Sequence, residues 1–172
     1  MTQFLLQMAG EAGTGKSSLA RAIGQANGAV VLDKDYFKAP LLEEGLSEEL
    51  AAGLAYAVFF SLAGSLLRQG HSLILDSPAF YPSIPARGAL LAEEVGATYR
   101  LIECRCPAES QEQRLNQRQG LASQPASRAA KVASMLKPEI TPLIEPHLTI
   151  DTSKPLDVCL EQALRYLERG EG

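Results

Sequence analysis

The most constraining feature of the sequence is a glycine-rich octapeptide near its start. Residues 10–17 read Gly-Glu-Ala-Gly-Thr-Gly-Lys-Ser and match the pattern Gly-x-x-x-x-Gly-Lys-Ser. In this pattern the glycines let the backbone wrap closely around phosphates and aim its N–H groups at their oxygens. The lysine, Lys16, reaches the β- and γ-phosphates of a nucleoside triphosphate, and the hydroxyl of Ser17 can bind Mg²⁺. The octapeptide therefore predicts a phosphate-binding loop, or P-loop, with Lys16 catalytic and Ser17 a metal ligand.

The residues on both sides of the P-loop agree with this prediction. Residues 3–8 form an apolar run that is too short for a helix and is expected to be the first strand. Residues 17–23 follow, with Leu19, Ala22 and Ile23 on one helical face. The N-terminus of such a helix favours bound phosphates through its partial positive charge and free N–H groups. The nucleotide-binding residues expected here are Gly10, Glu11, Ala12, Gly13, Thr14, Gly15, Lys16, Ser17 and Ser18.

The rest of the chain alternates between short apolar runs and helical patterns. Further strands are expected at 29–33, 72–76, 98–105 and 148–151, and helices at 47–69, 85–94, 107–118, 127–136 and 155–169. Residues 34–46 contain Pro40 and Gly45 and are expected to be a polar loop. Such alternation predicts an α/β fold with a parallel sheet covered on both faces, in which ligands bind beyond the carboxyl ends of the strands. The 172 residues suit one domain, residues 1–172.

Composition and charge narrow the classes of protein further. The net charge of −4 argues against general coating of nucleic acid. No uninterrupted run of about 18 apolar residues occurs, so we expect no membrane span. The N-terminus has no basic segment, so we expect no signal peptide. Cys104, Cys106 and Cys159 lack a framework spacing and are expected to be free thiols rather than a disulfide scaffold or a metal site. These features predict a cytoplasmic protein.

Two of the expected strands end in acids that would face bound phosphates. Asp76 ends the run Leu-Ile-Leu-Asp, an arrangement like the Walker B motif, in which the acid helps to hold Mg²⁺; the alternative is that it only caps the next turn. Asp33 and Asp35 follow the second strand, where a carboxylate can accept the proton of an acceptor hydroxyl and orient its oxygen. We expect Asp35 to be this base. The alternatives are Asp33 as the base, Asp33 in support of Mg²⁺ or Lys34, and no special role for the pair.

Basic side chains concentrate in residues 100–137, which hold seven basic and three acidic residues. Arg114 and Arg118 are four residues apart and share a helix face, where like charges repel unless an anion lies between them. A helix–loop–helix that carries several arginines can close over ATP, exclude water and stabilise the transferring phosphoryl group. We expect such a lid at about residues 114–135, with Arg114 and Arg118 catalytic. The alternative is a solvated basic helix whose arginines pair with nearby glutamates.

Aromatic residues gather in two segments that are expected to form the acceptor pocket, residues 36–60 and 77–87. An aromatic cluster can stack on a substrate that carries a ring. The alternative, given equal weight, is that the aromatics of the long helix are simply core. The residues concerned are Tyr36, Phe37, Tyr56, Phe59, Phe60, Phe80 and Tyr81.

Four sequence features together resemble the small P-loop kinases. They are the P-loop, residues 32–35 (Leu-Asp-Lys-Asp), residues 73–77 (Leu-Ile-Leu-Asp-Ser) and the spacing Arg114-Leu115-x-x-Arg118. More narrowly, they resemble the AAA-type ATP-binding proteins related to zeta-toxin, chloramphenicol phosphotransferase, gluconate kinase and the polynucleotide kinase domain. The resemblance extends from Phe4 to about Leu167. The P-loop is highly specific for nucleotides, whereas the other motifs say little about the acceptor.

The resemblance implies a nucleoside-kinase-like fold, a five-stranded parallel sheet in the order 2-3-1-4-5 with a helical lid. It implies that Asp35 matches the acid that activates the acceptor hydroxyl. It also implies that Arg118, with Arg114, contacts phosphates or stacks on adenine. The loop at residues 152–155, with Ser153 and Pro155, matches the place where such kinases hold the edge of the adenine.

The sequence therefore predicts a kinase that transfers the γ-phosphate of ATP·Mg²⁺ to a small hydroxyl-bearing molecule, acting as a monomer or a homodimer. Relatives that phosphorylate nucleic-acid ends often carry an arginine three residues after the acid, where this chain has Lys38. A polynucleotide or nucleotide 5′-end kinase stays an alternative, as does a non-kinase P-loop ATPase that acts as a nucleotide-dependent binding module. A GTPase-like switch is disfavoured, because Asp76 is followed by Ser-Pro-Ala rather than by the Asp-x-x-Gly pattern.

Overall fold

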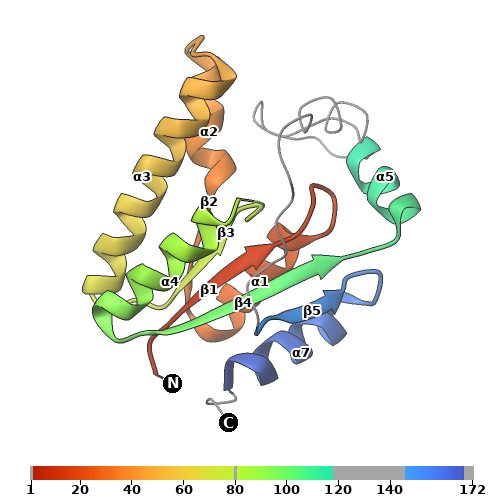
Figure 1. Cartoon of the computed structure of the whole chain (residues 1–172). Coiled ribbons are helices and arrows are strands. Elements are labelled where there is room, and N and C mark those ends of the chain that lie inside the picture. Colours follow the sequence, from red (N-terminus) through yellow and green to blue (C-terminus); the bar gives the residue numbers. More distant parts are fainter. Residues whose placement is uncertain (1, 80, 118–145, 169–172) are drawn as a thin grey trace.

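The computed structural model of the chain describes residues 2–79, 81–117 and 146–168. Helices and strands alternate along these residues (Figure 1). In chain order they are β1 (Phe4–Ala9), α1 (Lys16–Asn27), β2 (Val30–Asp33), α2 (Lys34–Glu43), α3 (Glu48–Arg68), β3 (Leu73–Asp76), α4 (Ser83–Val95), β4 (Thr98–Arg105), α5 (Ala108–Asn116), β5 (Leu148–Asp151) and α7 (Leu156–Glu168). The helix expected at 127–136, most of the expected lid, Arg118 and Phe80 lie outside the described residues.

The described strands form one parallel sheet in the order β2-β3-β1-β4-β5, which confirms the predicted topology. β1 lies in the middle and is buried along its whole length, as expected for an apolar central strand. Met8 of β1 pairs with Asp76 of β3, and Asp76 pairs in turn with Asp33 of β2. Because the strands are parallel, the P-loop and both of these acids lie at the carboxyl edge of the sheet.

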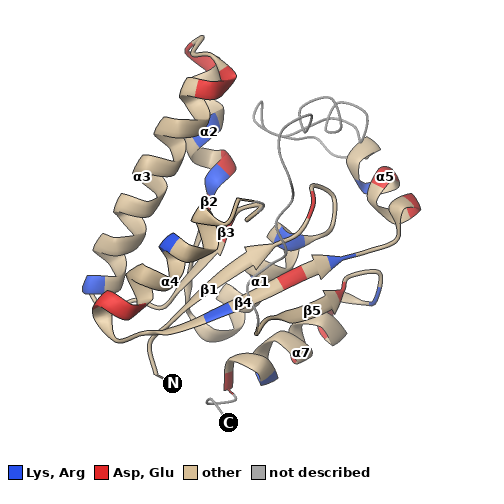
Figure 2. Ribbon diagram, in the orientation of Figure 1, with Lys and Arg blue, Asp and Glu red and all other residues tan. Residues whose placement is uncertain are grey.

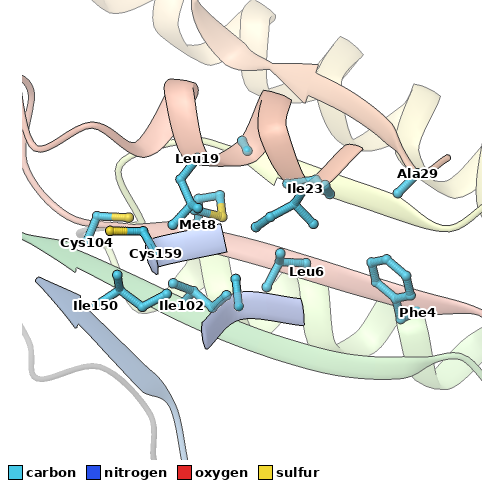
Figure 3. Packing of buried hydrophobic residues seen from close by; sticks show 13 residues of the cluster. Phe4, Leu6, Met8, Leu19, Ile23, Ala29, Ile102, Cys104, Ile150 and Cys159 are labelled. Carbon is cyan, nitrogen blue, oxygen red and sulfur yellow. The ribbon is translucent and has the colours of Figure 1, made fainter. Parts of the chain in front are cut away.

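Each face of the sheet is covered by helices with their own hydrophobic cluster. On one face, α1 and α7 pack over alternate residues of β1 and β4. Figure 3 shows Leu6 and Met8 of this layer beside Ile23 of α1, with the thiols of Cys104 and Cys159 at one end. On the other face, α3 and α4 pack over the intervening strand residues. All three cysteines are free thiols.

Residues 34–43 are helical, so the prediction of a polar loop at 34–46 is wrong for most of its length. Asp33 caps this helix, because its side chain accepts a 2.9 Å hydrogen bond from the backbone N–H of Asp35. Pro40 lies inside the helix. α2 also packs along α3, where the rings of Phe37 and Phe59 meet edge to face at 5.8 Å. The cap and this tertiary contact outweigh the helix-breaking tendency of the proline.

α3 has one buried and one exposed side. Its buried side includes Phe59, Phe60, Ala63 and Leu67, which belong to the cluster beneath α3 and α4. Among the described residues α3 is the one helix that is long and apolar enough to cross a membrane, and only 39% of its most apolar window is buried. A core helix passes the same test of length and composition, and the buried side of α3 is core here.

Candidate active site

The P-loop is folded as a tight turn that requires glycine at its ends. Gly10 has a φ of +123°, and a Cβ atom there would lie 2.3 Å from the carbonyl oxygen of Cys104. Gly15 has a φ of +83° and forms the N-cap of α1. Residues other than glycine rarely adopt such positive φ values. The loop therefore leads from β1 directly onto the N-terminus of α1, the geometry in which helix N–H groups bind phosphate.

Lys16 begins α1 and is largely buried. Its Nζ atom donates a 2.7 Å hydrogen bond to the backbone carbonyl of Glu11, so the side chain folds back over the P-loop. The hydroxyl of Thr14 donates to the same carbonyl at 2.7 Å. The ammonium group is thereby held against the concave side of the loop, where it can meet phosphate oxygens.

Gln111, which sequence reasoning missed, and Thr152, which it placed only in the expected adenine-binding loop, brace the P-loop from outside. The amide of Gln111 in α5, which is 4% exposed, donates to the Oε2 of Glu11 at 2.9 Å and to the carbonyl of Ala12 at 2.6 Å. The hydroxyl of Thr152, in the turn after β5, lies 2.6 Å from the carbonyl oxygen of Thr14. No sequence motif marks Gln111, and the resemblance gave Thr152 no role of its own in its loop. The one sequence signal was that Gln111 stands four residues before the apolar Leu115, on the side of α5 that becomes buried.

Arg114 lies beside the P-loop but is engaged with the turn after β5. Its guanidinium donates to the carbonyl of Thr152 at 2.7 Å and approaches the Thr152 hydroxyl at 3.4 Å. The same guanidinium would lie 3.3 Å from a Cβ atom on Gly15. Ser153 and Pro155 are exposed in that turn, so the structure brings Arg114 and the predicted adenine-binding turn together. Arg118 lies outside the described residues.

Asp76 and Ser17 lie close together beneath the P-loop. Asp76 is buried, and burial raises the pKa of its carboxyl group, while Lys16 and a hydrogen bond with Ser17 oppose the rise. Its Oδ2 atom is buried and has no hydrogen-bond partner among the described residues. A buried carboxylate oxygen without a donor suits a cation or a water bound to one. The pair of Ser17 and Asp76 therefore fits the predicted Mg²⁺ site.

Asp33 and Asp35 have different surroundings, although they are only two residues apart. Burial raises the pKa of Asp33 to about 6, with a contribution from the neighbouring Asp76 carboxylate. Asp33 is also engaged as the cap of α2. Asp35 lies in the first turn of α2, and its Oδ1 atom is 2.9 Å from the Nζ of the buried Lys34. Asp33 thus caps α2, and the assignment of Asp35 as the catalytic carboxylate stays a prediction.

The aromatic residues near Asp35 divide into core and surface. Phe59 and Phe60 are buried and meet edge to face at 5.4 Å, so they are core, as one of the two sequence alternatives held. Tyr36 and Tyr81 are exposed. Tyr56 lies between the two groups, with its ring 5.8 Å from the Nζ of Lys34; burial raises the pKa of its hydroxyl, and a hydrogen bond with Ser77 lowers it. Tyr36 and Tyr81, rather than Phe59 and Phe60, are therefore the aromatic side chains exposed near Asp35.

Lys38 stands one turn after Asp35 and forms an ion pair with Glu48 at the start of α3. This ion pair links α2 to α3, and the carboxylate of Glu48 neutralises the charge of Lys38. Figure 2 shows acidic residues at the connection of α2 and α3, further charges along α2, and none in the middle of α3. The position at which nucleic-acid end kinases often carry an arginine therefore holds a cation that is already neutralised.

Comparison with solved structures relates this arrangement to kinases of the same fold. A candidate kinase from Chloroflexus aurantiacus J-10-fl is 23% identical, with a TM-score of 0.75 over 99% of this chain and 98% of that one. APS kinase from Mycobacterium tuberculosis, solved with AMPPNP and APS, is 19% identical, with a TM-score of 0.73 over 98% and 99%. A gluconokinase from Sinorhizobium meliloti 1021 is 16% identical, with a TM-score of 0.62 over 98% and 99%. At these identities the likeness is one of fold.

Sequence comparison identifies the family. No protein with a curated description matches the chain. The profile of the AAA domain family AAA_33 matches residues 5–137, which include the P-loop, both strand-end acids and α5. The chain therefore belongs to the AAA_33 family of P-loop AAA domains and has the fold of the small P-loop kinases.

Proposed function

We propose that this protein is an ATP-dependent phosphotransferase that moves the γ-phosphoryl group of ATP to the hydroxyl group of a small molecule. One observation carries the proposal. The Lys16 and Ser17 end of the P-loop and the Asp35 carboxylate lie at the same edge of the sheet, on either side of Asp76. A phosphate donor and a hydroxyl acceptor can meet between them in line, as phosphoryl transfer requires.

On the donor side, the P-loop and α1 provide positive potential for the triphosphate. The backbone N–H groups of the loop and of the first turn of α1 bind phosphate oxygens. Lys16 exchanges its 2.7 Å hydrogen bond with the carbonyl of Glu11 for contacts to the β- and γ-phosphates. This charge stabilises the leaving group as the bond to the γ-phosphorus breaks.

Ser17 and Asp76 would hold Mg²⁺ at the same place. When bound, Mg²⁺ neutralises charge on the β- and γ-phosphate oxygens. The buried Oδ2 of Asp76 supports this assignment, because a lone buried carboxylate oxygen is costly without a cation or a donor nearby. No cluster of three or more His, Cys, Asp or Glu side chains suited to a metal occurs among the described residues.

On the acceptor side, Asp35 accepts the proton of the substrate hydroxyl as its oxygen bonds to the γ-phosphorus and ADP departs. The ion pair with Lys34 orients the Asp35 carboxylate, and the ring of Tyr56 limits the space on the far side of Lys34. Asp33 fixes the start of α2 and so the position of Asp35. The exposed Tyr36 and Tyr81 provide aromatic surface for the rest of the acceptor.

The test is a screen of hydroxyl-bearing acceptors with γ-labelled ATP and Mg²⁺, run on the wild type and on Asp35→Asn. We expect Asp35→Asn to bind ATP as the wild type does and to lose phosphoryl transfer by about 10²–10⁴-fold, the usual contribution of a general base. Asp157→Asn, at an exposed position of α7, is the matched control and should transfer normally. Normal transfer by Asp35→Asn would show that the base is another residue. Tight ATP binding without transfer to any acceptor would favour the nucleotide-dependent binding module.

A further inference from the structure

The exposed side of α3 carries a row of large apolar side chains. Leu50, Leu54, Val58 and Leu62 follow one another at intervals of four residues, with exposed fractions of 54%, 42%, 54% and 38%. Residues four apart in a helix form a continuous ridge. Isolated exposed leucines are ordinary, but a contiguous apolar row marks a surface of interaction. We call these four residues the α3 ridge.

A row of small residues runs beside the α3 ridge. Gly53, Ala57, Ser61 and Ser65 also follow at intervals of four, and each is at least partly exposed. A groove of about 470 Å³ lies here, lined by Ala57, Val58, Ser61, Leu62 and Ser65. Its lining is mostly apolar and comes from α3 alone. The same helix face therefore presents a ridge of large side chains and a groove that large side chains can enter.

Ridge and groove on one helix are complementary to a second copy of the same helix. In helix packing, the i±4 ridge of one helix fits the i±4 groove of its neighbour. A two-fold axis near Val58 would place the ridge of each copy in the groove of the other, and both contacts would form at once. From this geometry we propose that the protein forms a homodimer through the exposed face of α3, with the two helices antiparallel.

The charges of α3 agree with an antiparallel pair. Residues 50–67 contain no charged side chain, and charge is depleted at the centre of protein interfaces. Acidic residues occupy the first turn, Glu48 and Glu49, and Arg68 occupies the last. An antiparallel arrangement brings the acidic end of one copy to the basic end of the other. Figure 2 shows these charges at the two ends of an otherwise uncharged α3.

The area of the α3 face reaches the lower limit for a specific dimer, and the charges of α3 disfavour a membrane as the partner. A helix of 21 residues is about 31 Å long and about 11 Å wide, so half of its circumference presents about 500 Å². Two such faces together offer at most about 1,000 Å², the least that a specific interface buries, so we expect a dimer that dissociates on dilution. Helices that lie on membranes carry lysine and arginine on their polar side, whereas α3 begins with two glutamates and its other side is core.

The test is the molecular mass of the full chain in solution, measured by light scattering and by sedimentation over a wide range of concentration. We expect a wild-type dimer, a monomer for Val58→Glu, and a dimer for Val158→Glu. Val158 is the matched control, because it is a valine with 38% exposure on α7, which covers the opposite face of the sheet. An unchanged circular dichroism spectrum and a cooperative melting transition in Val58→Glu would show that the loss is of association and not of folding.

Three results would overturn the proposal. They are a wild type that stays monomeric at every concentration, a dimer that withstands both Val58→Glu and Leu54→Glu, and binding of the wild type to neutral phosphatidylcholine vesicles that Val58→Glu abolishes. The last result would make the α3 face a membrane contact. Dimerisation does not depend on the proposed kinase activity, so either inference can fail alone.

Discussion

The side-chain amide of Gln111 in α5 donates a 2.9 Å hydrogen bond to the carboxylate of Glu11 inside the P-loop. This contact ties an acid of the phosphate-binding loop to the helix that leads toward residues 118–145. A second hydrogen bond, of 2.6 Å, joins the same amide to the carbonyl of Ala12. Gln111 therefore holds both the backbone and the acidic side chain of the loop in one position.

Replacing Gln111 with alanine should weaken binding of ATP about tenfold, because a buried hydrogen bond to a charged group is worth about 1.5–3 kcal/mol and part of it orders the loop. Titration with a fluorescent ATP analogue measures the change. Gln113→Ala is the control, since Gln113 is exposed on the same helix. Equal affinities for Gln111→Ala and the wild type would mean that the loop keeps its shape without α5.

Substitution of Gly10 and of Gly28, which lie at the two ends of the segment from the P-loop through α1, should have different effects on stability and on ATP binding. Gly10→Ala should lower the free energy of unfolding by about 3 kcal/mol and abolish ATP binding, because its Cβ would collide with the carbonyl of Cys104 at 2.3 Å. Gly28, at the C-terminus of α1, has a φ of +77°, but a Cβ atom added there would meet no atom within 4 Å. Gly28→Ala should therefore cost about 1 kcal/mol and leave ATP binding intact. Urea unfolding and nucleotide titration of both variants check the prediction.

The Thr152 hydroxyl should contribute to stability as well as to the site. Thr152→Val keeps the shape of the side chain but leaves the carbonyl of Thr14 without its 2.6 Å contact, and a buried polar group left unpaired costs about 1–3 kcal/mol. Thr149→Val is the counterpart on the exposed side of β5 and should change stability by less than about 0.5 kcal/mol. Chemical denaturation of both variants measures the difference. Similar losses of stability for Thr152→Val and Thr149→Val would contradict a stabilising role of the Thr152 hydroxyl.

The raised pKa of Asp33 predicts that stability falls with rising pH. Between the ordinary pKa of 3.8 and the raised value of about 6, the folded chain holds a proton that the unfolded chain has released. The free energy of unfolding therefore decreases as the pH rises through this window, from about 4 to about 6. Above pH 6 this carboxyl group causes no further decrease. Asp33→Asn removes the carboxyl but keeps a side-chain oxygen that can accept from the N–H of Asp35.

The Asp33→Asn variant should be the more stable protein above the window, by about 1 kcal/mol, since solvent screens a partly exposed group. Below the window the two proteins should be equally stable. Thermal unfolding at a series of pH values, without nucleotide and with EDTA, gives the two profiles. Profiles that run parallel across the whole range would show that Asp33 does not titrate in this way.

Much of this fold could be predicted because its signals are local. The P-loop is a contiguous pattern, and Leu73–Asp76 indicates both a buried strand and the acid at its end. α2 was missed because Pro40 and Gly45 are local signals for a break, while its support comes from Phe59 in another helix. Local sequence carries no information on a contact of that kind.

The acids of the candidate site could be predicted from the sequence, whereas the residues that hold the P-loop in place were harder to predict. Lys16 was predicted from the P-loop pattern, Asp76 from its place at the end of an apolar strand, and Asp35 from its place just after the second strand. Gln111 and Thr152 are polar residues of common types, and their importance comes from partners 99 and 138 residues away in the chain. The same holds for the exposed face of α3, since the sequence shows that the helix is apolar but not which side faces solvent.

The helical hairpin of α2 and α3 is one uninterrupted segment between the end of β2 and the start of β3. It carries Asp35 and most of the proposed acceptor surface, whereas the nucleotide side is assembled from the P-loop, α5 and the turn after β5. If the proposed function holds, most of the acceptor side is encoded in one contiguous segment, whereas the donor side is encoded in several separate segments. Exchange of residues 34–72 with the equivalent hairpin of another family member would transplant acceptor choice while leaving the ATP site as it was.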